Sequence, residues 1–66
     1  MDEQDVLLIP QEAAAMLRYE IQTLANRRFK GLGPKYIKLP PNGHIRYRLA
    51  DLKAFIEENS IQPDEG

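Results

Sequence analysis

Two amide side chains on one predicted helix carry recognition chemistry. Gln22 and Asn26 are four residues apart and therefore share one face of a helix. A side-chain amide can pair with the major-groove edge of adenine through two hydrogen bonds. Thr23 can contact a thymine methyl group or a phosphate, and Arg27 can reach guanine or a phosphate. An ordinary solvent-exposed helix surface would contain the same polar residues. The distribution of charge along the chain is therefore needed to distinguish base reading from simple solvent exposure.

Basic residues downstream of this helix are candidates for binding phosphate groups. Arg46 and Arg48 alternate along a predicted strand, and Lys38 lies in the strand before it. We expect these three cations to bind phosphates beside or in the minor groove. The remaining candidate phosphate contacts are Arg18, Tyr19, Lys30, His44 and Tyr47. Of these, His44 is expected to be exposed near a hairpin tip, and Tyr47 to pack inward with its hydroxyl toward a phosphate.

The net charge of −1 conceals a strongly basic central segment. Residues 1–9 contain three acids and no base, and residues 57–66 contain four acids and no base. Residues 10–56 contain all nine Lys and Arg against three acids, so nine minus three gives a charge of +6. A basic segment of this kind attracts a phosphate backbone, although a solvated charged surface remains an alternative.

Apolar periodicity and turn residues predict the elements that position these side chains. Residues 11–17 form a helix with Pro10 in its first turn, and residues 21–29 form a second helix after a short turn. The apolar arc of the second helix contains Ile21, Leu24, Ala25 and Phe29. Arg28 falls within this arc, so its stem is expected to cover the core while its head reaches an acid.

A hairpin and a closing helix are predicted next. Residues 36–39 and 44–48 form strands around the turn at Pro40-Pro41-Asn42-Gly43. Alternation predicts one apolar face and one cationic face on this hairpin. Residues 49–59 form the last helix, whose apolar stripe closes the core. That stripe consists of Leu49, Leu52, Phe55 and Ile56.

Catalytic and metal chemistry have few candidate residues here. The chain has one histidine and no cysteine, and the adjacent Glu57 and Glu58 point in different directions on a helix. Gly31 and Gly33 precede a proline and a strand rather than a helix, unlike a phosphate-cradling loop. We therefore expect no enzyme activity, cofactor or metal. With no apolar run near the roughly 18 residues of a membrane span, and no leader segment, a cytoplasmic protein is expected.

Several short motifs occur in a fixed order across residues 7–58. They are Leu8-Ile9-Pro10-Gln11-Glu12-Ala13-Ala14 with Leu17, Thr23-Leu24, Gly31 with Gly33-Pro34, Tyr36 with Lys38-Leu39, Ile45-Arg46-Tyr47-Arg48, and Asp51-Leu52 with Ala54-Phe55. Together they resemble the excisionase and AlpA-type DNA-binding family, itself similar to MerR-type winged helices.

This resemblance implies an α+β winged helix-turn-helix fold, with three short helices and a two-stranded β-hairpin wing. The domain would span residues 7–59, between flexible acidic tails at 1–6 and 60–66. The implied function is sequence-specific binding of double-stranded DNA by an excisionase that bends attachment-site DNA and assists a phage or element integrase. We expect a monomer in solution that self-associates cooperatively on DNA. Alternatives are a small transcriptional regulator and a protein-interaction subunit of a phage packaging or replication complex.

The sequence departs from that family mainly at the starts and turns of its helices. Arg18 replaces a turn glycine, Glu20 replaces a Ser or Thr, and Arg27 replaces an aromatic residue. Ile9 and Ala50 stand where the first and third helices usually have small polar caps. Each missing cap costs about 1 kcal/mol. The melting temperature without DNA is therefore expected below about 80 °C, and it should rise when DNA binds.

Overall fold

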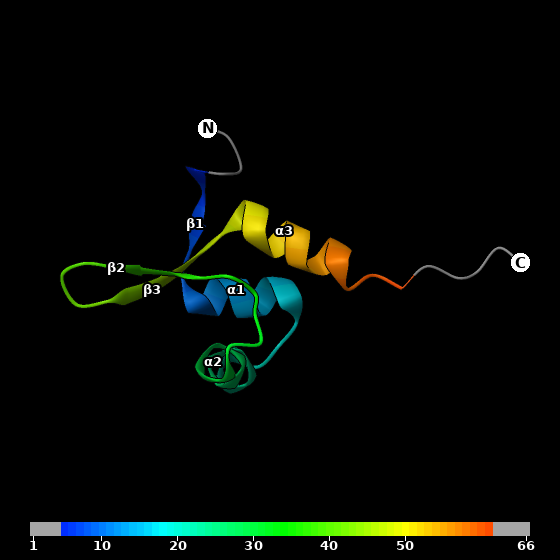
Figure 1. Ribbon diagram of the computed structural model, residues 1–66, viewed down its shortest axis with the longest axis horizontal. Helices are drawn as coiled ribbons and strands as arrows, with labels where there is room; N and C mark the ends of the chain where they lie inside the picture. Colours follow the sequence, from blue (N-terminus) through cyan, green and yellow to red (C-terminus); the bar gives the residue numbers. More distant parts are fainter. Residues whose placement is uncertain (1–4, 62–66) are drawn as a thin grey trace, which may run out of the picture.

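Three helices and three short strands form an α+β domain in the computed structural model, which describes residues 5–61 (Figure 1). In chain order the elements are β1 (Leu7–Leu8), α1 (Pro10–Leu17), α2 (Ile21–Lys30), β2 (Ile37–Leu39), β3 (His44–Arg48) and α3 (Leu49–Glu58). The predicted bounds agree to within one residue for every helix and for both hairpin strands.

The sheet is antiparallel and has the strand order β1-β3-β2. The two strands of the predicted hairpin, β2 and β3, pair with each other. A third strand that was not predicted, β1, also pairs with β3, placing Leu7 opposite Arg48 and Leu8 opposite Tyr47. Two residues are too few to give a period-2 pattern, and the short apolar run at residues 6–9 did not by itself identify a strand. The backbone N–H of Leu49 donates to the carbonyl of Val6 at 3.0 Å, which ties down the end of the segment predicted as a tail. Of the two predicted tails, residues 1–4 and 62–66 lie outside the described residues.

The buried core lies where α1, α2, α3 and the sheet meet. It consists of Ala13, Ala14, Leu24, Tyr47 and Leu52. The prediction that Tyr47 packs inward is confirmed, and Ala13 and Ala14 of α1 are buried as well. A buried phenol needs a hydrogen-bond partner, and Arg28 Nη1 donates to the Tyr47 hydroxyl at 3.0 Å. The head of Arg28 therefore reaches Tyr47 rather than the acid that the sequence led us to expect.

Three residues predicted to face the core are exposed instead. Phe29 is 93% exposed, Ile21 is 48% exposed and Ile56 is 41% exposed. The inner side of α2 is centred near Leu24, and at about 100° per residue Phe29 is rotated about 140° away from it. The apolar arc drawn from the sequence was therefore too wide, because it counted Phe29 by residue type rather than by angle.

Helices α1 and α2 end with the same backbone geometry but with different residues. Arg18 follows α1 with φ 60° and ψ 31°, and Gly31 follows α2 with φ 70° and ψ 28°. The next N–H in each case bonds back to a carbonyl five residues earlier, at 2.9 Å, as in a Schellman motif. This left-handed conformation is unstrained for glycine but costs free energy when the residue is arginine.

None of the three helices has a side-chain hydrogen bond from its N-cap residue, as expected for the first two caps. The third N-cap is Arg48, not the predicted Ala50, because α3 begins directly at the end of β3. In α1 the carboxylate of Glu12 accepts a hydrogen bond from the backbone N–H of Ile9 at 3.0 Å. This is one half of a capping box, and Ile9 has no side-chain acceptor for the other half.

Candidate nucleic-acid interface

Helix α2, the loop after it and the β2–β3 hairpin form a continuous stretch without acidic residues. Residues 21–48 contain seven Lys or Arg and no Asp or Glu. The acids of the described residues lie before β1, in α1, in the α1–α2 turn and in α3. The acid-free basic segment, residues 21–48, is therefore shorter than the basic segment inferred from the sequence, residues 10–56, and its charge of seven minus zero, +7, exceeds the +6 of that longer segment.

The side of α2 turned away from the core carries the predicted base-reading residues. We call this the α2 face, and it comprises Gln22, Thr23, Asn26, Phe29 and Lys30, all exposed. Gln22 Nε2 donates to Asn26 Oδ1 at 3.2 Å. The two predicted adenine-reading amides are thus brought together, and Gln22 Oε1 and Asn26 Nδ2 remain as a neighbouring acceptor and donor.

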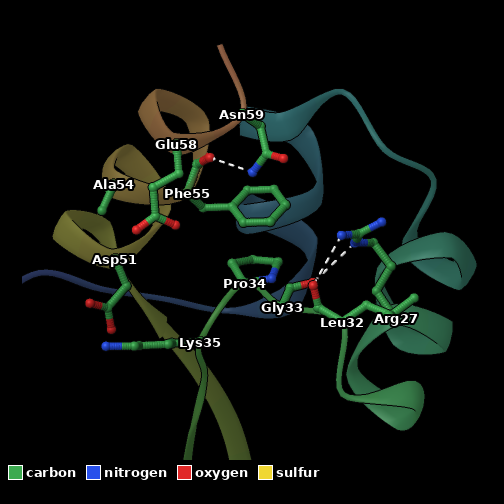
Figure 2. Close-up of a pocket in the computed structure, with 10 residues that line it drawn as sticks. All are labelled: Arg27, Leu32, Gly33, Pro34, Lys35, Asp51, Ala54, Phe55, Glu58 and Asn59. Atoms are coloured by element: carbon green, nitrogen blue, oxygen red, sulfur yellow. Dashed lines mark hydrogen bonds between the residues drawn. The ribbon is translucent and has the colours of Figure 1, made fainter. Parts of the chain in front are cut away.

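Arg27 points to the other side of α2 and holds the following loop. Its Nε donates to the carbonyl of Gly33 at 3.0 Å, and its Nη2 donates to the carbonyl of Leu32 at 3.1 Å (Figure 2). The guanidinium also lies over two rings, 5.6 Å from the centroid of Tyr19 and 5.4 Å from that of Phe55. These contacts link α2 to the α1–α2 turn and to α3, so we no longer assign Arg27 a role in reading bases.

The pairing of β2 with β3 divides the hairpin cations between two faces. Lys38 is opposite Ile45, and Ile37 is opposite Arg46. Because directly opposed residues in an antiparallel pair share a face, Lys38 and Arg46 are on different faces. The near face, on the α2 side, comprises Tyr36, Lys38, Ile45 and Tyr47. The far face comprises Ile37, Leu39, His44, Arg46 and Arg48.

The prediction of one apolar face and one cationic face was therefore wrong. Each strand alternates as expected, but the register places the apolar positions of β2 on the same side as the cationic positions of β3. Alternation within a strand is visible in the sequence, whereas register depends on the turn and on packing. The position of the near face is fixed by α2, since Arg28 also lies 5.9 Å from the ring centroid of Tyr36.

A shallow groove of about 510 Å³ separates the α2 face from the near face of the hairpin. Gln22, Asn26 and Phe29 line it from α2, and Tyr36 and Lys38 line it from the hairpin side. The structure therefore brings three predicted site residues, Gln22, Asn26 and Lys38, to one concave surface. Thr23 and Lys30 border this surface on the exposed side of the helix.

The other predicted phosphate contacts are distributed around this surface. His44 and Arg48 are exposed on the far face, and Arg46 is half-buried there, with Nη1 donating to the carbonyl of Ile45 at 2.7 Å. Arg18 is exposed at the end of α1. The two tyrosines are not free: Tyr19 lies half-buried under Arg27, and Tyr47 is fully buried. We therefore remove both tyrosines from the proposed contacts.

A second depression, of about 310 Å³, lies between the loop after α2 and α3 (Figure 2). Two acids, Asp51 and Glu58, line it, and Lys35 points toward Asp51. Within residues 5–61 no group of three or more His, Cys, Asp or Glu side chains is arranged to hold a metal ion. None of the helices in that range has the length and apolar character needed to cross a membrane.

Phe29 and Tyr36 also belong to the surface of the candidate interface, and neither was predicted from the sequence. A signal for Phe29 was present, because at about 100° per residue it falls only about 20° from Gln22. No comparable signal was available for Tyr36, whose position in the groove depends on the pairing register. Its ring centroid is 6.2 Å from that of Tyr47, which anchors it to the core.

Comparisons with known proteins assign no family to this chain. No family model matches it, and neither curated proteins nor solved structures give a significant match. The resemblance to excisionases therefore depends on the residues and their spacing alone.

Proposed function

We propose that this protein binds double-stranded DNA as a winged helix-turn-helix module, with α2 in the major groove and the β2–β3 hairpin as the wing. The proposal rests mainly on the groove between α2 and the hairpin, which is lined by Lys38 and by the hydrogen-bonded amides of Gln22 and Asn26. These residues belong to a stretch of the chain that contains no acid. A helix fits the major groove, where amides can distinguish adenine from the other bases.

The short connection between α1 and α2 supports this arrangement. Three residues separate the two helices, as is typical of helix-turn-helix motifs. α1 packs against α2 through its small buried alanines, leaving the opposite side of α2 open. An open polar helix held on a rigid support is what base reading in a groove requires.

Cations on both faces of the hairpin support its role as a wing. A ribbon placed edge-first between two DNA strands presents one face to each phosphate backbone. Lys38 on the near face would bind one backbone, and Arg46 and Arg48 on the far face would bind the other. With Arg18 and Lys30, this makes five phosphate contacts, for which log K should fall with log salt at a slope of about −4.5.

Excisionase activity is the specific role we propose, following the motif resemblance. Monomers would bind adjacent sites cooperatively, bend the DNA and present a surface to an integrase. A small transcriptional regulator would use the same DNA-binding surface. Bending and cooperativity measurements on attachment-site DNA of an integrase-bearing element separate the two: independent binding to straight DNA would exclude the architectural role.

The test of DNA binding is the double variant Arg46→Ala/Arg48→Ala, measured by fluorescence anisotropy on duplex DNA. The proposal predicts at least a tenfold loss of affinity at low salt with an unchanged circular dichroism spectrum. Lys53→Ala, which removes one positive charge from α3 outside the proposed surface, is the control and should bind nearly as tightly as the parent protein. Unchanged DNA binding by the double variant would contradict the proposed wing contacts, and an absence of DNA binding by the parent protein would contradict the proposal and favour a protein-interaction module.

A further inference from the structure

Phe29 is the most exposed aromatic side chain in residues 5–61, at 93%. It projects from the last turn of α2 and lines the groove that the amides and Lys38 also line. An aromatic ring left in water forfeits the free energy of burial. Because Phe29 lies on the candidate interface rather than in the core, we expect the binding partner of that surface to supply the group that covers the ring.

The angular position of Phe29 groups it with the base-reading amides. At about 100° per residue it lies about 20° from Gln22 and about 60° from Asn26 around the helix axis. Ala25, one turn earlier, is small and half-buried, so it leaves the ring uncovered. If α2 enters a groove along this face, Phe29 must enter with it.

The charges around Phe29 determine what kind of surface it can meet. Lys30 adjoins it in sequence, Lys38 stands across the groove, and residues 21–48 contain no acid. A partner must therefore combine negative charge with an apolar group at the contact. The major groove of DNA has both, because phosphates flank it and the thymine 5-methyl group is an apolar group on the base edges within it.

We propose that Phe29 reads thymine 5-methyl groups in the major groove, beside adenines contacted by Gln22 and Asn26. An A·T base pair presents the adenine edge and the thymine methyl in the same groove. The hydrogen-bonded amide pair and the phenyl ring together select A·T pairs over G·C pairs. This inference rests on the proposed DNA binding and adds the chemical feature that the site recognises.

The experiment compares thymine with uracil, which lacks only the methyl group. A duplex is enriched from a random-sequence pool by the parent protein, and a second duplex of the same sequence is made with deoxyuridine in place of thymidine. We expect the parent protein to lose about fourfold in affinity for each methyl group that Phe29 buries. Phe29→Ala should bind the thymine duplex more weakly than the parent does and should bind the two duplexes equally.

Two controls keep the result specific to the phenyl ring. Ile61→Ala removes another apolar side chain, 95% exposed and outside the interface, and should retain the full preference for thymine. Thermal unfolding of Phe29→Ala should match the parent protein, because so exposed a ring contributes little to packing.

The outcomes separate this inference from the proposal on which it rests. If no duplex is enriched, the proposed sequence-specific DNA binding is itself contradicted. If a duplex is enriched but the parent protein binds the uracil duplex equally well, or Phe29→Ala keeps the thymine preference, the role of Phe29 is overturned while DNA binding stands. Loss of self-association in Phe29→Ala without any change in thymine preference would likewise overturn it and identify a protein contact instead.

Discussion

Two pairs of arginines, Arg27–Arg28 in α2 and Arg46–Arg48 in β3, have the same charge and very different surroundings. The guanidinium of Arg27 is fixed by two loop carbonyls and two rings, and that of Arg28 by the Tyr47 hydroxyl and the Tyr36 ring. Arg48 is exposed, and Arg46 bonds only to the neighbouring carbonyl among the interactions described above. Charge in a sequence therefore does not distinguish an arginine that holds the fold from one available to a partner.

The largest expected difference between the pairs is in stability. Arg27→Ala removes two hydrogen bonds to Leu32 and Gly33 and the contacts with two aromatic rings. We expect it to lower the free energy of unfolding by about 2–3 kcal/mol, whereas Arg48→Ala should change it by less than about 0.5 kcal/mol. Urea denaturation followed by circular dichroism measures both. Equal losses for the two variants would show that the contacts of Arg27 do not stabilise the fold.

A smaller effect is expected where Arg28 meets the core. Tyr47→Phe keeps the buried ring but removes the acceptor for Arg28 Nη1, so we expect a loss of about 1–2 kcal/mol. Tyr36→Phe, at a partly exposed tyrosine, is the matched control and should be nearly neutral. In a double-mutant cycle with Arg28→Ala, Tyr47→Phe should show a coupling of about 1 kcal/mol. Strictly additive losses would argue against a stabilising hydrogen bond.

The smallest effect concerns Arg18, where the backbone rather than the guanidinium decides stability. Arg18→Gly should raise the free energy of unfolding by about 0.5–1 kcal/mol by relieving the left-handed conformation. At the matched position after α2, Gly31→Ala should lower it by about 1 kcal/mol. A Cβ at Gly31 would meet no atom within 4 Å, so only backbone strain is tested. Thermal unfolding measures both, and a destabilised Arg18→Gly would contradict this account of the turn.

Sequence periodicity was sufficient to locate the helices and the hairpin because their apolar spacings and turn residues are local signals. Pro10, Gly31 and the Pro40–Gly43 turn placed the boundaries to within one residue. The inward position of Tyr47 also followed from alternation. The exposed amides of Gln22 and Asn26 could be predicted because helical spacing alone puts them on one face.

The features that the sequence did not predict depend on contacts between distant residues. β1 is defined by its partner strand, and the two faces of the hairpin are defined by register. The inward turn of Arg27 depends on carbonyls in a loop whose path is set by Gly33 and Pro34. The exposure of Phe29 is different, because helical spacing alone places it about 20° from Gln22 and could have predicted it.

The salt dependence of DNA affinity tests the account most directly, because it counts phosphate contacts without requiring a known target sequence. For the parent protein we predict a slope of log K against log salt of about −4.5, and for Arg46→Ala/Arg48→Ala a slope of about −2.7. Arg27→Ala, measured at a temperature where it remains folded, should keep the parent slope. A parent slope near zero would contradict DNA binding, and a change of slope in Arg27→Ala but not in the double variant would reverse the roles of the two arginine pairs.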